Sequence, residues 1–327
     1  MDITRSMAEI ESVLDAWNVP VRGVQSIEVP GVYHVDSTDG ERYVLKNVGG
    51  MEMATRTDVQ FRVTRHVHES GIPIAYLLPS KRDSFYCTDG SEMFVLMPFL
   101  HGEETNFYGP ESSPAYRNLG IAYGRLHACL AEFDGAIDTR RIDLYDLVFN
   151  DYAPRWLPHL AGDVRTKVEA TLEELRAPLQ LLTSELPVQV ILLDCHVGNV
   201  RMVRGEFHGF IDCDHICMGQ RFMDVVTALS SMVRYVGRNG LPVGGDRDEQ
   251  RGYWLSRFGQ FLSGYHGVNP LSEIERDNLW LGMLSCCFPD EREIKGGVPI
   301  LEHMDWFYSN RKAMELVVRD SVPLRGS

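Results

Sequence analysis

One stretch of this chain, residues 190–226, constrains its fold more than any other part. An apolar run stops abruptly at Asp194, and Asn199 follows five residues later. Two β-like runs separated by an Arg-Gly-Glu turn occupy residues 200–211, and Asp212 stands directly after them. The stretch therefore predicts a hairpin that brackets an amide side chain and carboxylates at the ends of its strands.

Hard oxygen donors gathered in one place are what a divalent cation carrying a phosphate requires. Magnesium is usually held by one or two carboxylates, while phosphates and water fill its remaining positions. A further carboxylate can accept the proton of an attacking hydroxyl. Any isolated aspartate is better explained as an ordinary loop acid. The joint spacing of Asp194, Asn199, Asp212 and Asp214 instead indicates phosphoryl transfer.

These motifs resemble those of a known family of small-molecule kinases, the aminoglycoside phosphotransferase and choline kinase-like family. Its members usually carry H-G-D-x-H-x-x-N, then I-D-F/W-D/E, and then G-x(3,4)-D-L/V. The corresponding segments of this chain are residues 192–199, 211–214 and 219–224.

The resemblance implies a role for each residue that matches the motifs. Asp194 would be the catalytic base that deprotonates a hydroxyl of the acceptor. Asn199 and Asp212 would hold Mg²⁺, and Asp214 is an additional candidate for the same site. The resemblance therefore implies that ATP and Mg²⁺ are the cofactors.

Two further residues of the stretch would support this machinery. Asp224 would brace the catalytic loop by accepting hydrogen bonds from its backbone, and His196 would be a second structural support. The chain departs from the family pattern at Leu192, Leu193 and Cys213, where a His, a Gly and an aromatic residue are usual. None of these departures removes a group that performs the chemistry.

The resemblance also implies a two-lobed, protein kinase-like α+β fold. Residues 1–98 would form a nucleotide-binding lobe, an antiparallel sheet with a helix. Residues 99–327 would form a mainly helical lobe that carries catalysis and substrate binding. The residue pattern agrees, because Asp-Gly hairpin turns at residues 39–40 and 89–90 separate strand-like runs, whereas helical spacing begins near residue 112.

Lys46 is the expected anchor of the nucleotide in the smaller lobe. It ends an apolar alternation on the third expected strand, where a nucleotide-kinase lysine neutralises phosphate charge. The helix expected at about residues 53–69 should offer it a partner. By register that partner is Gln60, which can accept a hydrogen bond but brings no charge, and Glu52 and Glu69 are alternatives.

Two further segments would complete the nucleotide site. The turn that contains Gly31 would overlie the phosphates, although a single glycine is far from a phosphate-binding fingerprint. Backbone groups near Met97 and Phe99 would bind the edge of the adenine, where an apolar strand runs into the expected hinge.

The charge of the chain limits its partners. A formal net charge of −14 argues against binding to nucleic acid or to an anionic membrane, because phosphate groups require a basic surface. The same charge is compatible with a cationic substrate. No apolar run approaches the roughly 20 residues of a membrane helix, and the acidic N-terminus does not resemble a secretion signal. A cytoplasmic protein is expected, and the oligomeric state is left open.

The sequence thus predicts an ATP- and Mg²⁺-dependent phosphotransferase that moves the γ-phosphate to a hydroxyl of a small molecule. The acceptors to consider are an aminoglycoside, choline or ethanolamine, homoserine, or a similar amino-alcohol. One alternative is a catalytically inactive nucleotide-binding pseudokinase, if the departures at Gln60 and Leu192 disable the site. Another is a zinc-stabilised binding module. Its ligands would come from Cys195, His196, Cys213, His215 and Cys217.

Overall fold

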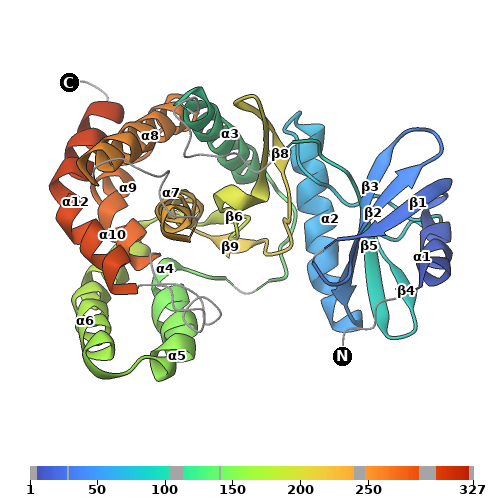
Figure 1. The fold of residues 1–327 in the computed structure, drawn as a ribbon, viewed down its shortest axis with the longest axis horizontal. Helices are drawn as coiled ribbons and strands as arrows, with labels where there is room; N and C mark the ends of the chain where they lie inside the picture. Colours follow the sequence, from blue (N-terminus) through green and yellow to red (C-terminus); the bar gives the residue numbers. More distant parts are fainter. Residues whose placement is uncertain are drawn as a thin grey trace.

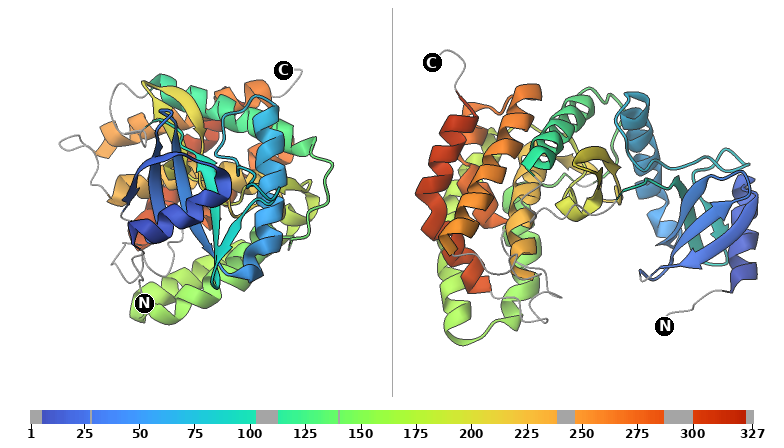
Figure 2. Two further views of the ribbon diagram at one scale, coloured as in Figure 1. Left: turned by 90° about the vertical axis from the view of Figure 1, so that its right-hand side faces the viewer. Right: turned by 45° about the horizontal axis from the view of Figure 1, so that its top comes forward.

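The computed structural model describes residues 6–27, 29–102, 113–139, 141–238, 247–286 and 300–323. The chain forms two lobes that lie side by side, a smaller one built on a sheet and a larger one that is mainly helical (Figure 1). The two-lobed α+β architecture predicted from the sequence is confirmed. Further views show that helix α2 and a β-hairpin lie where the lobes meet (Figure 2).

The smaller lobe contains a five-stranded antiparallel sheet with the order β1-β2-β3-β5-β4. Its central strand, β3, pairs Lys46 with Val32 on one side and with Val95 on the other. The strands are β1 (Val21–Ser26), β2 (Val32–Ser37), β3 (Arg42–Gly49), β4 (Cys87–Asp89) and β5 (Glu92–Pro98).

The two faces of this sheet pack against different helices, because successive side chains of a strand point to opposite sides. Helix α1 (Met7–Leu14), capped by Ser6, covers the face that carries Leu45. Helix α2 (Ala54–Glu69) packs Phe61 against the other face, with Val95. Lys46 follows Leu45 and therefore lies on the α2 side of the sheet, which is the side of the larger lobe (Figure 1).

Backbone contacts join α2 and the segment after it to the larger lobe. The N–H of Ala75 donates to the carbonyl of Phe210, and the N–H of Phe210 donates to the carbonyl of Pro73. Val63 of α2 belongs to the core of the larger lobe, whereas Phe61 belongs to the cluster under the sheet. Helix α2 is thus part of both hydrophobic cores.

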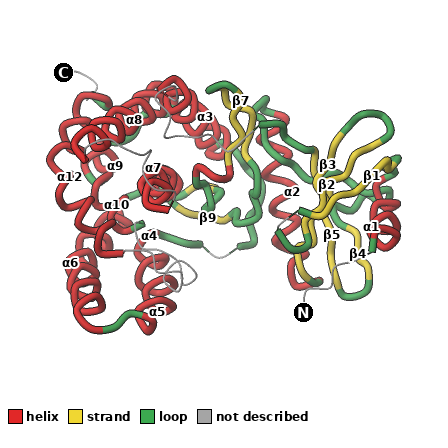
Figure 3. The backbone as a smooth tube through the Cα atoms, in the orientation of Figure 1, coloured by secondary structure: helices red, strands yellow, loops and turns green. Residues whose placement is uncertain are grey.

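Helices build most of the larger lobe (Figure 3). The long helices α3 and α8 cross closely enough that a Cβ at Gly264 would lie 2.3 Å from the carbonyl oxygen of Arg117. A six-residue π-helical segment, η4, covers Leu147–Tyr152. The helices are α3 (Ser113–Ala131), α4 (Leu144–Asp146), α5 (Ala153–Trp156), α6 (Gly162–Glu185), α7 (Arg221–Arg238), α8 (Arg247–Val268), α9 (Glu273–Asp277), α10 (Leu279–Ser285) and α12 (Ile300–Ser321).

Two small antiparallel pairs lie at the centre of the molecule, between α3 and α2 (Figure 1). The hairpin expected from the sequence is formed by β7 (Val200–Val203) and β8 (Glu206–Phe210). Its turn places Arg204 and Gly205 at positive φ, as tight hairpin turns require. The second pair, β6 (Gln189–Ile191) with β9 (Cys217–Gly219), brings together the two ends of the stretch that organises the sequence.

Candidate active site

The two β-pairs position the polar residues of the predicted site at one end of the hairpin. Asn199 directly precedes β7, and Ile211 directly follows β8. The N–H of Ile211 donates to the carbonyl of Asn199 at 2.9 Å, so these residues face each other across the open end of the hairpin. Asp212 is the next residue, and Asp194 lies in the loop that β6 leads into. Residues far apart in the motif therefore converge.

Asn199 connects directly to the expected catalytic base. Its Nδ2 donates to the main-chain oxygen of Asp194 at 2.9 Å and to the Oδ2 of the same residue at 3.3 Å. Because Nδ2 makes these bonds, Oδ1 is the Asn199 atom that could bind a cation. The Asp194 side chain is 41% exposed, which leaves its carboxylate open to an acceptor.

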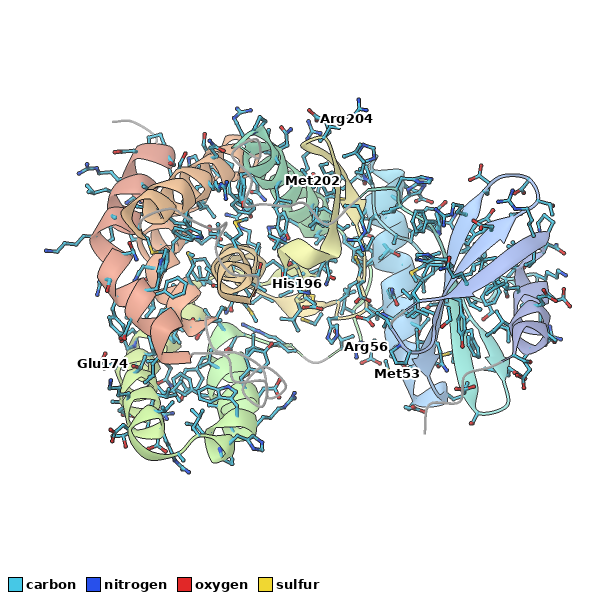
Figure 4. The ribbon with its side chains drawn as sticks, in the orientation of Figure 1. Met53, Arg56, Glu174, His196, Met202 and Arg204 are labelled. Atoms are coloured by element: carbon cyan, nitrogen blue, oxygen red, sulfur yellow. The ribbon has the colours of Figure 1, made fainter. Side chains whose placement is uncertain are left out.

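His196 supports the same loop. Its Nδ1 accepts a hydrogen bond from the N–H of Gly198 at 3.1 Å. Its Nε2 lies 3.8 Å from Oδ1 of Asp194. The ring lies at the centre of the molecule, close to the β6–β9 pair (Figure 4). These contacts connect His196 to the loop of Asp194, and its role as a structural support stays a prediction.

Lys46 reaches across from the smaller lobe to two acids of this segment. Its ammonium group donates to Oδ1 of Asp212 and, at 3.1 Å, to Oδ2 of Asp214. Burial alone would lower the pKa of Lys46, but the two carboxylates outweigh it and raise the pKa. The lysine therefore stays charged and links the lobes.

The Cys213 thiol lies among these charges. Its pKa is raised well above the usual value, first by complete burial and then by the carboxylates of Asp212 and Asp214. Lys46 and Asp194 act on the same thiol, with opposite signs. One strand lysine and three aspartates are thus close enough to influence a single buried atom.

This donor set fits a magnesium ion. Two carboxylates already hold one cation, the Lys46 ammonium group, and the Oδ1 atom of Asn199 is a further hard oxygen. Carboxylate and amide oxygens are the ligands that Mg²⁺ prefers, and it takes only one or two carboxylates from a protein. Asp212 and Asn199 would hold such an ion, with Asp214 as the additional candidate.

Asp224 holds the loop that leads to Asp194 through hydrogen bonds to its backbone. Its two carboxylate oxygens accept hydrogen bonds from the N–H groups of Leu192, at 3.0 Å, and Leu193, at 2.9 Å. His127 lies 3.2 Å from the same carboxylate through Nε2, and its Nδ1 lies 2.8 Å from the hydroxyl of Tyr265. This buried network is the bracing arrangement that the resemblance implied for Asp224.

The backbone explains why a glycine is usual at position 193. Leu193 has φ +66°, in the left-handed region that glycine adopts without strain. Asp212 is likewise left-handed, at φ +56°, a conformation that Asp tolerates better than most residues. The loop therefore keeps its shape with leucine at 193, held by the carboxylate of Asp224.

Gln60 is buried on α2, and no hydrogen bond joins its amide to Lys46. The α2 residue that reaches the site is Arg56, four positions earlier on the same helix face, whose Nε donates to the main-chain oxygen of Asp214. Arg56 lies on the side of α2 that faces the larger lobe (Figure 4). The only sequence signal for it is this i, i+4 spacing.

Gly31 lies next to the strand pair that contains Lys46. It precedes Val32, which pairs with Lys46, and its carbonyl accepts a hydrogen bond from the N–H of Asn47 at 2.8 Å. Gly31 has φ +76°, and a Cβ there would lie 3.1 Å from the Cβ of Asn47. The tight approach and the left-handed backbone both favour glycine at this turn.

The backbone groups at the end of β5 alternate in direction. The N–H of Phe99 donates to the carbonyl of Arg42 at 2.9 Å, and Met97 pairs with Val44. Alternate residues of an antiparallel ladder direct their backbone groups to opposite sides. The groups of Met97 and Phe99 are therefore turned towards β3, and the carbonyl of Pro98 is the one turned away.

The zinc alternative finds no support in the described residues. No group of three His, Cys, Asp or Glu side chains is arranged there to hold a metal ion. Cysteine binds zinc as the thiolate, but burial raises the pKa of Cys217 to about 12 and the pKa of Cys213 well above its usual value. Within the same ranges, none of the helices combines the length and the apolar surface needed to cross a membrane.

Comparisons with known proteins agree with this geometry. A family model described as "Phosphotransferase enzyme family" matches residues 27–271. A homoserine kinase of Neisseria meningitidis serogroup B is 24% identical over 260 residues, which cover 79% of this chain and 77% of that protein. A homoserine kinase of Methylobacillus glycogenes is 26% identical over 219 residues, covering 67% of this chain and 62% of that one.

A solved structure shows the same fold. The structure of an amicoumacin kinase in complex with AMP-PNP, Ca²⁺ and a molecule named Ami superposes with a TM-score of 0.65 at 16% identity. The superposition covers 98% of this chain and 95% of the other. The predicted protein kinase-like architecture of small-molecule kinases is confirmed.

Proposed function

The chain belongs to the phosphotransferase enzyme family, and we propose that it uses ATP and Mg²⁺ to phosphorylate a hydroxyl group of a small molecule. One observation carries the proposal. Lys46 of the sheet is held by Asp212 and Asp214, next to the loop of Asp194 and Asn199. A strand cation, hard oxygen donors and an exposed carboxylate are the parts that phosphoryl transfer requires.

In the proposed reaction, the acceptor oxygen forms a bond to the γ-phosphorus while the bond to the β–γ bridging oxygen breaks. The hydroxyl proton passes to the carboxylate of Asp194, and ADP leaves. Asn199 keeps that carboxylate oriented through its hydrogen bond to Oδ2. Lys46 would neutralise charge on the nucleotide phosphates, because its ammonium group stays protonated.

Bound at Asp212 and Asn199, Mg²⁺ would supply charge neutralisation for the phosphate oxygens. We propose that the edge of the adenine binds at the carbonyl of Pro98, because the neighbouring groups of Met97 and Phe99 are turned towards β3. The aliphatic side chain of Val44 lies on the same face of the sheet as Lys46 and would form an apolar wall of that site.

The acceptor with the best support is L-homoserine, because the two relatives described above, which match 67% or more of this chain, are named homoserine kinase. Amicoumacin-like antibiotics, aminoglycosides, choline and ethanolamine are the other acceptors to compare. All of them present a hydroxyl and a cationic nitrogen, and the net charge of −14 is compatible with a substrate that carries such a group.

Radiolabelled or NMR-detected phosphate transfer from Mg-ATP to L-homoserine and to the other acceptors tests the proposal. We expect transfer to one of them, and a fall in kcat of about 100- to 10,000-fold in Asp194→Asn, because a general base contributes about that much. Nucleotide binding should persist, since Asn keeps the shape of the side chain. Asp163→Asn, an exposed aspartate in the first turn of α6, is the matched control.

The inactive pseudokinase makes the opposite prediction. Such a protein would gain thermal stability from ATP, because a ligand that binds the native state stabilises it. It would transfer no phosphate to any acceptor and hydrolyse no ATP beyond the level of Asp194→Asn. That result would reject the enzyme proposed above.

A further inference from the structure

The lysine in this site has an unusual set of neighbours. Gln60 brings no charge to Lys46 and makes no hydrogen bond to it. Both carboxylates that hold Lys46 come from the loop after β8 instead of from helix α2. A contact between α2 and that loop would therefore give the helix a polar route to the lysine, besides its packing against the sheet.

Arg56 makes such a contact. It lies in the first turn of α2, partly buried, and its Nε donates to the main-chain oxygen of Asp214. The side chain of the same Asp214 accepts from Lys46 at 3.1 Å and lies 3.4 Å from Nε2 of His215. Asp214 is thus bound at its main chain by Arg56 of α2 and at its side chain by Lys46 of β3.

A second observation places the guanidinium beside this segment. The pKa of Cys217, in β9, is raised by burial and by Asp224, and Arg56 is the neighbouring charge that acts in the opposite direction. Arg56 therefore lies close to residues 214–217, the connection between the acids and β9.

We propose that Arg56 is a positioning residue that couples helix α2 to the phosphate-binding acids by fixing the main chain at Asp214. A carboxylate on α2 could position Lys46 by pairing with it directly. Arg56 instead positions Asp214 through its backbone carbonyl, and Asp214 in turn holds Lys46. The inference rests on the proposed function, and it adds a residue and a route by which closure of α2 onto the larger lobe reaches Lys46.

The chain offers a matched control on the same helix. Arg62 also joins α2 to the larger lobe, since its NH1 donates to the main-chain oxygen of Ala136 at 2.8 Å. It lies nearly two turns further along α2 and contacts no acid of the site; its carboxylate partner is Asp58. Arg62→Ala removes an equivalent interlobe bond without touching Asp214.

Two measurements on the full chain test the proposal. The first is hydrogen exchange followed by mass spectrometry, without ligand and with Mg-ATP. Arg56→Ala should speed exchange at residues 212–217, whereas Arg62→Ala should speed it near residue 136 only. This readout does not depend on turnover, so it remains informative if no acceptor is found.

The second measurement is steady-state transfer from Mg-ATP to L-homoserine. We expect Arg56→Ala to lower kcat about 10- to 100-fold, the effect of losing one hydrogen bond from a charged group, with a smaller change in KM for ATP. Arg56→Lys should recover part of the loss, because an ammonium group can also donate to a carbonyl. Arg62→Ala should keep kcat within about twofold of the wild-type enzyme.

Equal kcat losses in Arg56→Ala and Arg62→Ala would overturn the proposal, as would unchanged exchange at residues 212–217 in Arg56→Ala. Absence of transfer by the wild-type protein would count against the proposed function instead. The exchange result would then decide alone whether Arg56 fixes the segment.

Discussion

At the scale of single residues, Leu193 shows what the loop conformation demands. A left-handed backbone costs a residue with a Cβ roughly 1–2 kcal/mol. The two N–H···carboxylate bonds from Leu192 and Leu193 to Asp224 hold that conformation in place. Leucine is therefore tolerated at position 193, although its left-handed backbone is strained, because the bonds to Asp224 hold the loop.

Because of this strain, we expect glycine and alanine variants to differ in stability in opposite directions at positions 192 and 193. Leu193→Gly should be more stable than Leu193→Ala by about 1 kcal/mol, because both lose the side chain but only glycine relieves the positive φ. At Leu192, whose φ is negative, Ala should be the more stable of the pair. Urea unfolding of the four variants measures the difference. The same order at both positions would contradict the strain.

The sequence predicted the residues of the site better than their contacts. Asp194, Asn199, Asp212 and Lys46 come together because strand ends and a hairpin fix where their side chains lie. The contact between Arg56 and Asp214 could not be predicted. Arg56 donates to a main-chain oxygen, which every residue has, so the sequence of the partner gives no signal for the bond.

At the scale of elements, the close crossing of α3 and α8 supports the buried network behind the loop that carries Asp194. Gly264 of α8 lies against the main chain of Arg117 in α3. Tyr265, the next residue, hydrogen-bonds His127 of α3, which in turn contacts Asp224. The separation of the two helices therefore sets the position of the groups that brace the loop.

A pair of glycine substitutions in α8 tests this crossing. Gly264→Ala should destabilise the protein by about 1–3 kcal/mol, because its Cβ would lie 2.3 Å from a backbone oxygen and the helices must separate. Gly267→Ala, with no atom within 4 Å of the new Cβ, should stabilise it by up to about 1 kcal/mol through helix propensity. Equal effects in chemical unfolding would show that the crossing is not tight.

Elements with local signals could be predicted, and those that depend on distant partners could not. The β7–β8 hairpin has alternating runs around a turn, so its position followed from the sequence. Each strand of the β6–β9 pair is three residues long, and the two strands are far apart in the sequence. The register of β5 on β3, which turns Phe99 towards the sheet, likewise depends on the partner strand.

At the scale of the whole molecule, the lobes are held together partly by the group that would bind the nucleotide. Lys46 of the smaller lobe neutralises Asp212 and Asp214, which follow the hairpin of the larger one. The order of elements could be predicted from periodicity and turns, and the two-lobed fold from the resemblance to small-molecule kinases. The ion pairs by which Lys46 joins the lobes could not be predicted, because they depend on how the lobes are placed relative to each other.

This bond predicts how the molecule responds to magnesium without nucleotide. In Lys46→Met, Asp212 and Asp214 lose the cation that both of them bind, and their mutual repulsion should lower the melting temperature. Added MgCl₂ should then raise the melting temperature by roughly 2 °C more in the variant than in the wild-type protein, where Lys46 competes for the same oxygens. NaCl at equal ionic strength controls for screening. Lys46→Met combined with Asp212→Asn should lose the extra response, and identical magnesium shifts in wild type and Lys46→Met would show that the ion binds elsewhere.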